Sequence, residues 1–563
     1  MKVAIGKQDF VSLREHDYFY IDKTDFIEKW WESGDDVTLI ARPRRFGKTL
    51  NMSMLNCFFS NEYAGRGDLF DGLSVWRYEK YRKLQGTYPV VFFSFADIKA
   101  DNIQDAKTQI KVKIAELYDQ NRHLLDGDVL NDNEKEVFKN VTMYMDDAVC
   151  SMAVNMMCRY KQRCYDRKVI LILDEYDTPV QEAYVHGYWK EFMPFLRSMF
   201  NSMFKTNPYL ERAVMTGITR VSKESIFSDL NNLNVVTTTS NEYSTCFGFT
   251  EEEVFKSLDT FGLSDKKTDV KNWYDGFVFG KSKDIYNPWS IINFLDKKTL
   301  SPYWASTSAN SLVNKLIRTA SSDVKKMMES LLNGDEIVVS FDEQIVFNQL
   351  DTDENAIWSL LVAGGYLKVN DVEYRGLLRK PWYHIGITNL ETLSMFSNMF
   401  SAWFSIGDAH YNQFVDALLK GNLKEMNIYM NDVALSTFSS FDTGTHPSGR
   451  TQPERFFHGF VLGLISDLRD IYEIKSNRES GYGRYDVMLI PICNNDTMYD
   501  AIVLEFKVYD SDAEGSLADT AKAALLQIED KDYDAELISR GIPKSHIRHY
   551  GFAFEGKKVL IAQ

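Results

Sequence analysis

Four short apolar runs limit what the first half of this chain can fold into. They lie at residues 37–41 (VTLIA), 90–95 (VVFFSF), 169–173 (VILIL) and 213–216 (AVMT), with helical-looking segments between them. Strands that are apolar on both sides must be covered on both faces, and strands that alternate with helices join a largely parallel sheet. The runs therefore predict an α/β domain, which we place at residues 1–285.

Two further regions follow with different patterns. Residues 286–400 have a helical character, and the segment FNQLDTDENAIWSLLVAGGYLKV within them indicates a small helical or winged-helix module. Residues 401–563 contain a Gly/Ser/Pro-bearing loop (FDTGTHPSGRTQP), which is followed by a helix, two strands, a helix and a strand. This last region is predicted to be a second α/β domain.

Charge and composition narrow the function classes. The net charge is −16, and residues 401–563 hold 16 Lys/Arg against 24 Asp/Glu, so any contact with nucleic acid needs a local groove or metal ions. No apolar run approaches the length of a membrane helix, and the start MKVAIGKQDF has no apolar signal core. The six cysteines form no CxxC pair. We expect free thiols, no membrane partner and a cytoplasmic location.

A phosphate-binding loop is predicted directly after residues 37–41. The segment ARPRRFGKT leads into the helical pattern LNMSMLNCFF, which is the strand, loop and helix order of a P-loop. Arg42 stands where the motif has its first glycine, so the alternative is simply a basic loop before a helix. For a P-loop, Lys48 would reach the β/γ-phosphates and Thr49 would bind Mg²⁺. The loop residues expected at the nucleotide are Arg45, Gly47, Lys48 and Thr49.

A buried strand that ends in two carboxylates supplies the second half of this site. In VILILDEYD, Asp174 would hold Mg²⁺ through water, and Glu175 would polarise the attacking water. The alternative is that these acids only begin the next turn. The two halves together predict nucleotide binding.

A third strand, in RAVMTGITR, places polar residues beyond its apolar core. Thr216 and Thr219 follow the core, and Arg220 comes next. Thr216 could sense the γ-phosphate, and Arg220 could neutralise charge in the transition state. A surface arginine in a turn explains Arg220 equally well.

A carboxylate–lysine pattern stands out near the C-terminus. In AIVLEFKV the two-residue period puts Val503, Glu505 and Lys507 on one strand face, and Asp486 opens an earlier strand, RYDVMLIP. Asp486, Glu505 and the carbonyl of Phe506 would hold Mg²⁺, while Lys507 would position the attacking water or stabilise the phosphorane. A Glu505–Lys507 salt bridge on an ordinary amphipathic strand is the alternative.

Neighbouring polar residues admit two interpretations. Thr451 to Glu454 form a capping box, and Glu454 could equally project as a further metal ligand. Gln527 could contact the site or be solvated, and His458 lies one turn from Glu454.

Taken together, these features resemble the bacterial family of AAA-ATPase-like proteins fused to a PD-(D/E)xK nuclease-superfamily domain. The resemblance spans nearly the whole chain and rests on RPRRFGKT, LDEYDTPV, TGITRVSKESIFSDLNNLNV, FGFTEEEV, WYDGF, YNPWSI, ERFFHGFVLGL, SNRESGYGRYDVMLIP and EFKV, among others. In that family Arg is common at the first P-loop position. The resemblance implies ATP and Mg²⁺ as cofactors, with Mn²⁺ as an alternative at the nuclease-like site. Its implied site residues are Lys48, Thr49, Asp174 and Glu175 for the nucleotide, and Asp486, Glu505 and Lys507, with Glu454 as a candidate, for the nuclease-like site.

Three hypotheses about function follow. The first is a nucleotide-gated nuclease that acts on nucleic acid, with DNA favoured over RNA. The second is a switch or signalling ATPase whose nuclease-like domain only binds nucleic acid or a protein partner. The third is an inactive P-loop that serves as a scaffold for an independent nuclease, and the presence of Lys48, Asp174 and Glu175 argues against it.

Overall fold

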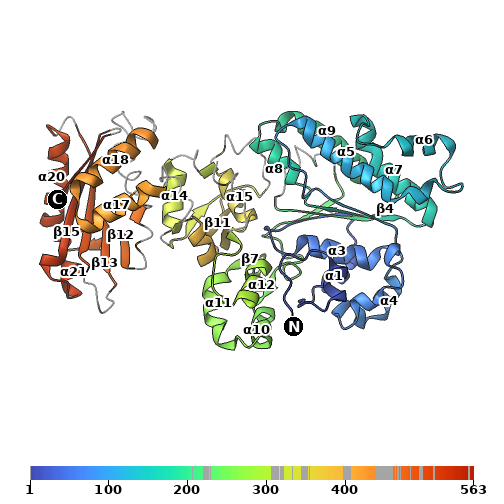
Figure 1. The fold of residues 1–563 in the computed structure, drawn as a ribbon, viewed down its shortest axis with the longest axis horizontal. Coiled ribbons are helices and arrows are strands. Elements are labelled where there is room, and N and C mark those ends of the chain that lie inside the picture. The colour runs from blue at the N-terminus through green and yellow to red at the C-terminus, as the bar shows by residue number, and fades with distance from the viewer. Residues whose placement is uncertain are drawn as a thin grey trace. The chain divides into compact units, whose positions relative to one another are not determined.

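A computed structural model gives the architecture, and its chain divides into two compact units (Figure 1). It describes residues 2–205, 207–219, 230–305, 322–332, 334–343, 355–396, 408–437, 471–481, 483–492, 499–510, 514–555 and 558–563, with isolated positions between these ranges. The first unit comprises residues 1–316 and 334–393, and the second comprises 317–333 and 394–563. The predicted boundaries at 285 and 400 stay predictions.

A five-stranded sheet forms the core of the first unit. Its order is β2-β3-β4-β1-β5, and every neighbouring pair is parallel, as the apolar runs predict. The strands are β1 (Val37–Ala41), β2 (Val90–Ser94), β3 (Val169–Asp174), β4 (Leu210–Gly217) and β5 (Leu233–Val236). All residues of β1 and β3 are buried because helices cover both faces of the sheet.

The helices are divided between the two faces of this sheet. Figure 1 shows α5, α7 and α9 on one side and α1, α3 and α4 on the other. Ile40, Ile172 and Val214 pack with residues of α1 and α3 in one apolar cluster. The helices are α1 (Phe10–Glu15), α3 (Lys48–Phe59), α4 (Glu79–Leu84), α5 (Ile103–Gln120), α7 (Asp147–Tyr165) and α9 (Trp189–Phe200).

Two small sheets complete the first unit. The first has the order β6-β8-β7 and the second, antiparallel, has the order β10-β11-β9. Helix α15 comes before the β10–β11 hairpin, and the predicted helical or winged-helix module at residues 286–400 stays a prediction. The elements are β6 (Phe249–Thr250), α10 (Glu251–Thr260), α11 (Lys267–Tyr274), β7 (Phe277–Phe279), β8 (Ser282–Tyr286), α12 (Pro288–Lys297), β9 (Ile337–Val339), α15 (Ala356–Ala363), β10 (Leu367–Arg375) and β11 (Lys380–Ile387).

A buried carboxylate joins segments of the first unit that are distant in sequence. Glu391 accepts hydrogen bonds from the Ser290 hydroxyl (2.8 Å) and the Trp304 amide (2.6 Å). Burial raises the pKa of Glu391 to about 7. Because Ser290 lies in α12 and Glu391 follows β11, these hydrogen bonds hold α12 against the segment after β11.

The second unit is built on a mixed five-stranded sheet of order β12-β13-β14-β15-β16. Ile502, Leu504 and Phe506 pack into one apolar cluster, whereas Val503 packs into another on the opposite face, as the two-residue period predicts. The elements are α14 (Ser322–Leu332), α17 (Asp408–Lys420), α18 (Leu423–Thr437), β12 (Tyr472–Ser480), β13 (Gly483–Pro491), β14 (Ala501–Val508), α20 (Leu517–Asp530), α21 (Ala535–Ser539), β15 (Ile547–Glu555) and β16 (Lys558–Ala562).

Among the helices that the structure describes, none combines the length and the apolar character that a bilayer crossing requires. The cysteines within the described ranges are free thiols, and Cys493 lies outside those ranges.

Candidate functional site

The predicted nucleotide residues converge because the strands that carry them are parallel. β4 lies between β1 and β3, so its end separates the loop after β1 from the end of β3. There the Thr216 hydroxyl donates a hydrogen bond to the buried carboxylate of Asp174, and Ser94 at the end of β2 donates to the other carboxylate oxygen (3.4 Å). Polar groups therefore meet at the carboxyl ends of three strands, β2, β3 and β4.

The loop after β1 has the backbone shape of a phosphate-binding loop. Arg45 (φ 66°) and Gly47 (φ 75°) both adopt the left-handed conformation, and α3 begins at Lys48. The Lys48 ammonium donates to the carbonyls of Arg42 (3.0 Å) and Pro43 (2.9 Å). Burial lowers the pKa of Lys48, and the nearby Glu175, Asp177 and Asp174 carboxylates oppose that effect.

Arg42 has a structural role that the sequence did not reveal. Its buried guanidinium donates to the carbonyls of Thr237 and Glu242 (3.1 Å to the latter) and stacks over the Phe279 ring at 4.6 Å. Burial lowers the pKa of Arg42 to about 10. The residue at the missing-glycine position thus fastens the loop to the segments after β5 and in β7.

A cavity of about 410 Å³ opens in front of this loop, within the usual size range of ligand sites. Lys48, Thr49 and Glu175 line it, whereas the buried Asp174 does not. Aromatic side chains, including Phe19, Phe249 and Trp289, also line the cavity, and such rings can pack against a planar base. The basic side chains along the cavity are Lys7, Lys23, Arg44, Arg45, Lys48 and Lys99, and the acidic ones are Glu175 and Glu182. This combination suits a nucleoside polyphosphate.

Glu175 occupies a special backbone position at the cavity. Its φ of 53° lies in the left-handed region, which few non-glycine residues adopt. Its amide donates to Thr216 Oγ1 (3.3 Å), and its carboxylate accepts from Thr178 (3.3 Å). The backbone turn after β3 therefore separates the directions of Asp174 and Glu175, so that only Glu175 lines the cavity.

Asp177 is a further residue that sequence reasoning missed. Its buried carboxylate oxygen accepts from the amides of Ile218 (3.0 Å) and Thr219 (2.8 Å), the Thr219 hydroxyl (2.7 Å) and Gln181 (2.9 Å). A Cβ on Gly217 would lie 2.7 Å from the Asp177 carboxylate, so only glycine permits this approach. Asp177 thus holds the segment that follows Thr216, and Thr219 faces Asp177. Arg220 lies outside the described residues.

We expect Asp177→Ala to destabilise the protein by about 3 kcal/mol, because buried donors lose a charged acceptor. Calorimetry should show that the unit containing Asp177 unfolds at a temperature several degrees lower than in the wild type. Asp265→Ala removes an exposed carboxylate of the same unit and should leave that unfolding temperature unchanged. An unchanged unfolding temperature in Asp177→Ala would show that the hydrogen bonds at this turn contribute little.

The second predicted site lies on two paired strands. β13 and β14 are antiparallel, with Val487 opposite Leu504, so Asp486 and Glu505 lie one step further along the same register. Asp486 accepts a hydrogen bond from the Phe506 amide (2.8 Å), which fixes the carboxylate against β14. Glu505 is 3% exposed. The fold therefore brings the two carboxylates to neighbouring strands.

Gln527 on α20 connects the charged residues of this site. Lys507 donates to the amide oxygen of Gln527 (2.7 Å), and the Gln527 amide nitrogen donates to Glu505 and to the Tyr533 hydroxyl (3.2 Å). Burial raises the pKa of Tyr533, and the Glu505 and Asp486 charges raise it further. Of the two interpretations for Gln527, the structure supports contact with the site.

The donor set of this second site fits a hard divalent cation. Asp486 and Glu505 offer carboxylate oxygens on adjacent strands, and the Lys507 ammonium is held beside them through Gln527. Glu454 and His458 lie outside the described residues. The roles of Asp486, Glu505 and Lys507 stay predictions, as do those of Lys48, Thr49, Asp174 and Glu175.

Family models match two segments of the chain, one toward each end. Residues 4–227 match the family model described as predicted AAA-ATPase, and residues 452–563 match that of the PD-(D/E)XK nuclease superfamily. The chain combines an AAA-ATPase-like domain with a PD-(D/E)XK nuclease-superfamily domain. The chain is also similar to a protein of Azotobacter chroococcum mcd 1, which is described as an uncharacterized protein in the vnfD 5' region. The two are 25% identical over 571 residues, which cover 99% of this chain and 98% of that protein.

Proposed function

We propose that this protein binds and hydrolyses ATP at the loop after β1 and that ATP controls a Mg²⁺-dependent nuclease, acting on DNA, in the second unit. The observation that carries the nuclease half is the Gln527 bridge. An amphipathic strand with a plain salt bridge would join Glu505 to Lys507 directly, whereas here both side chains are held by one amide on α20.

The chemistry at the nuclease site divides among the residues of this chain. Asp486 and Glu505 would hold the divalent ion, which would lower the pKa of a bound water and so supply the nucleophile at neutral pH. Lys507 would stabilise the negative charge that develops on the phosphate. Gln527 would keep the Lys507 ammonium oriented while Glu505 remains available to the metal.

The chemistry at the ATPase site follows the same division. Lys48 would leave its two loop carbonyls and contact the β/γ-phosphates, while Thr49 would hold Mg²⁺ directly and Asp174 would hold it through water. Thr216 hydrogen-bonds to Asp174 and accepts from the Glu175 amide, so it can report the state of the γ-phosphate to the end of β4. Asp177 would pass that change to the segment after Thr216.

Glu175→Gln should preserve ATP affinity within about threefold and lower turnover by at least about 100-fold, since it keeps the shape and removes the base. Isothermal titration and phosphate release measure the two quantities. Glu182→Gln, in the same cavity, is the matched control and should retain turnover. Equal turnover in Glu175→Gln and wild type would exclude Glu175 as the residue that polarises water.

The experiment that tests the whole proposal incubates purified protein with linear and circular DNA, with and without Mg²⁺ or Mn²⁺, and with and without ATP. Metal-dependent cleavage that changes with ATP supports the nucleotide-gated nuclease. The acidic balance of the chain favours the second candidate, a switch ATPase whose nuclease-like domain only binds nucleic acid or a protein partner. ATP turnover without cleavage of any DNA or RNA would select that second candidate.

A further inference from the structure

The tip of the β10–β11 hairpin exposes two adjacent leucines. Leu377 is 104% exposed and Leu378 is 95% exposed, more than any other exposed large apolar residue that the structure describes. Two adjacent, fully hydrated leucines at the end of a hairpin form a small apolar tip that is free to contact another molecule.

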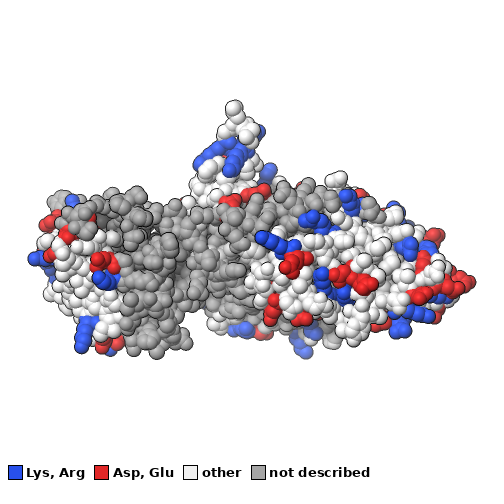
Figure 2. Space-filling view, turned by 90° about the horizontal axis from the view of Figure 1, so that it is seen from above, with Lys and Arg blue, Asp and Glu red and all other residues white. Residues whose placement is uncertain are grey.

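Basic side chains surround this tip. Arg375 stacks over Trp382 at 4.3 Å, and Arg379 lies over Tyr374 at 5.3 Å. Lys380 is exposed beside them, and Glu373 is the carboxylate that pairs with Arg375. Figure 2 shows a projecting knob with an uncharged end and basic side chains around it, at the position along the long axis where Figure 1 draws β11. The aromatic rings hold the guanidinium groups against the hairpin, which limits the entropy lost on binding.

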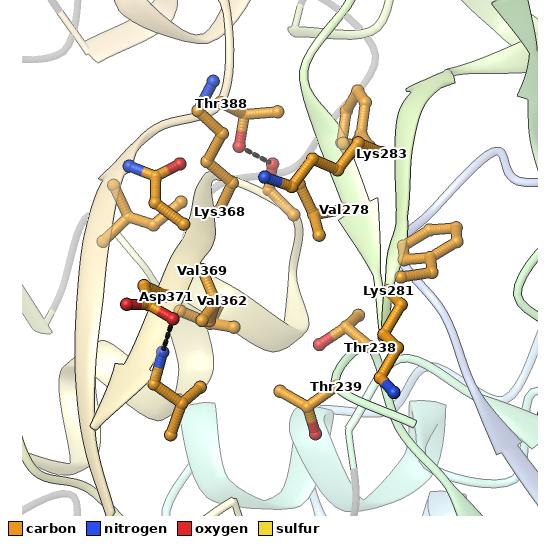
Figure 3. Close-up of a pocket in the computed structure, with 17 residues that line it drawn as sticks. Thr238, Thr239, Val278, Lys281, Lys283, Val362, Lys368, Val369, Asp371 and Thr388 are labelled. Carbon is orange, nitrogen blue, oxygen red and sulfur yellow. Dashed lines mark hydrogen bonds between the residues drawn. The ribbon is translucent and has the colours of Figure 1, made fainter. Parts of the chain in front are cut away.

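More basic side chains lie at the base of the same hairpin. A cavity of about 420 Å³ separates β10 from the β7–β8 hairpin, and Lys281, Lys283 and Lys368 line it. In Figure 3 Lys283 reaches from the β8 side toward β10, and Lys368 comes from β10 itself. None of the three forms an ion pair with another residue of the described ranges, and Asp371 at the rim accepts from the Val372 amide (2.9 Å). Three lysines and one aspartate thus line the cavity, which gives it an excess of positive charge in a chain whose net charge is −16.

The helix before this hairpin cannot make such contacts itself. α15 reads AIWSLLVA, has no charged side chain, and is buried from Ile357 through Val362. A helix that enters a DNA groove needs polar side chains on an accessible face. Unlike α15, the hairpin is exposed and carries basic side chains, so it can reach a polyanion.

We propose that the β10–β11 hairpin is a binding arm for duplex DNA, with the leucine tip inserted into a groove and the basic residues on the phosphates. A two-stranded ribbon fits a DNA groove, and apolar side chains at such tips act as wedges between base steps. β10 has nine residues, or about 30 Å, a length that spans about nine base pairs at 3.4 Å each. This inference rests on the proposed function and assigns DNA contact to the first unit as well as the nuclease domain.

The test measures binding of the full-length protein to a fluorescent 30-base-pair duplex by anisotropy in EDTA, so that no cleavage occurs. Salt is titrated from 50 to 300 mM. Arg379→Gln with Lys380→Gln should raise Kd by about tenfold or more and lower the salt slope by about 2, because two phosphate contacts are lost. The triple change of Lys281, Lys283 and Lys368 to Gln should act in the same direction. Lys135→Gln with Lys139→Gln, on an exposed helix of the same unit, is the matched control and should change neither quantity.

The contribution of the two leucines is measured by base unstacking, because an uncharged side chain does not change the salt dependence of binding. Leu377→Ser with Leu378→Ser should keep the salt slope and abolish the fluorescence increase of 2-aminopurine placed in the duplex, since the wedge that unstacks bases is gone. Both residues are fully exposed, so these variants should fold.

Two results would overturn the inference. One is unchanged DNA affinity and 2-aminopurine signal in all the hairpin variants. The other is that the wild type sediments with phosphatidylserine vesicles, whereas the leucine variants do not sediment with them and bind DNA as the wild type does. That result would assign the tip to a lipid surface. If the hairpin variants bind DNA as tightly as the wild type and still cleave it, the inference about the hairpin is wrong, while the proposed nuclease activity stands. DNA binding through the hairpin without metal-dependent cleavage would refute the proposed nuclease activity alone.

Discussion

Replacing Lys48 with alanine is expected to raise the Kd for ATP by at least about 100-fold. The ammonium is the charged group at the start of α3, and losing two charge-assisted hydrogen bonds to phosphate removes about 3 kcal/mol or more. Isothermal titration calorimetry with ATP and Mg²⁺ measures the change. In the free protein Lys48 binds the carbonyls of Arg42 and Pro43, so circular dichroism should accompany the titration to verify folding.

Lys99→Ala provides a matched control for Lys48→Ala. Lys99 lines the same cavity but is exposed and lies on the segment after β2, away from the loop after β1. Its removal should change the Kd for ATP by less than about fivefold, as expected for a solvent-screened charge. If Lys48→Ala binds ATP as tightly as the wild type, the phosphate-site assignment is wrong and the cavity serves another ligand.

Asp486→Asn is expected to lower the rate of DNA cleavage by at least about 1,000-fold, equivalent to about 4 kcal/mol of transition-state stabilisation. Asparagine keeps an oxygen that can accept from the Phe506 amide, so the strand pair should persist while the charge that attracts the metal is lost. Calorimetry with Mn²⁺ should show weaker binding than in the wild type. Plasmid nicking measures the rate.

Lys507→Ala should separate metal binding from catalysis at the same site. It leaves both carboxylates in place and removes the cation that Gln527 orients, so Mn²⁺ binding should persist while cleavage stops. Lys522→Ala, an exposed lysine on α20, is the control and should cleave normally. If Asp486→Asn leaves the Mn²⁺ heat unaltered, and if both variants cleave DNA as the wild type does, the residues form an ordinary polar cluster.

The parallel sheet and the two strand faces at the C-terminal site were predictable because they depend on local pattern. Runs such as 37–41 and 169–173 are apolar throughout, and only a strand covered on both sides accommodates that composition. In AIVLEFKV the alternation alone assigned Val503 and Leu504 to opposite faces. Such signals need no knowledge of distant segments.

Contacts between distant segments were not predictable in this way. In the sequence, Arg42 is a departure from the phosphate-loop motif. In the structure, its guanidinium donates hydrogen bonds to the carbonyls of Thr237 and Glu242, about 200 residues later. Asp177 is one of three acids at the end of a strand in the sequence, whereas in the fold its carboxylate accepts the hydrogen bonds that hold the turn after β4. Gln527 had no sequence signal that distinguishes a bridging amide from a solvated one.

The sequence by itself determined which charged side chains can bind phosphate or metal, because side-chain chemistry and the strand period are local properties. Only the tertiary structure decided that Thr216 lies between Asp174 and Glu175 and that Gln527 joins Lys507 to Glu505. It also decided that the helix α15 is buried while the tip at Leu377 is exposed. The reason is physical: hydrogen bonds and burial depend on which segments pack together, and that packing is set by the whole chain.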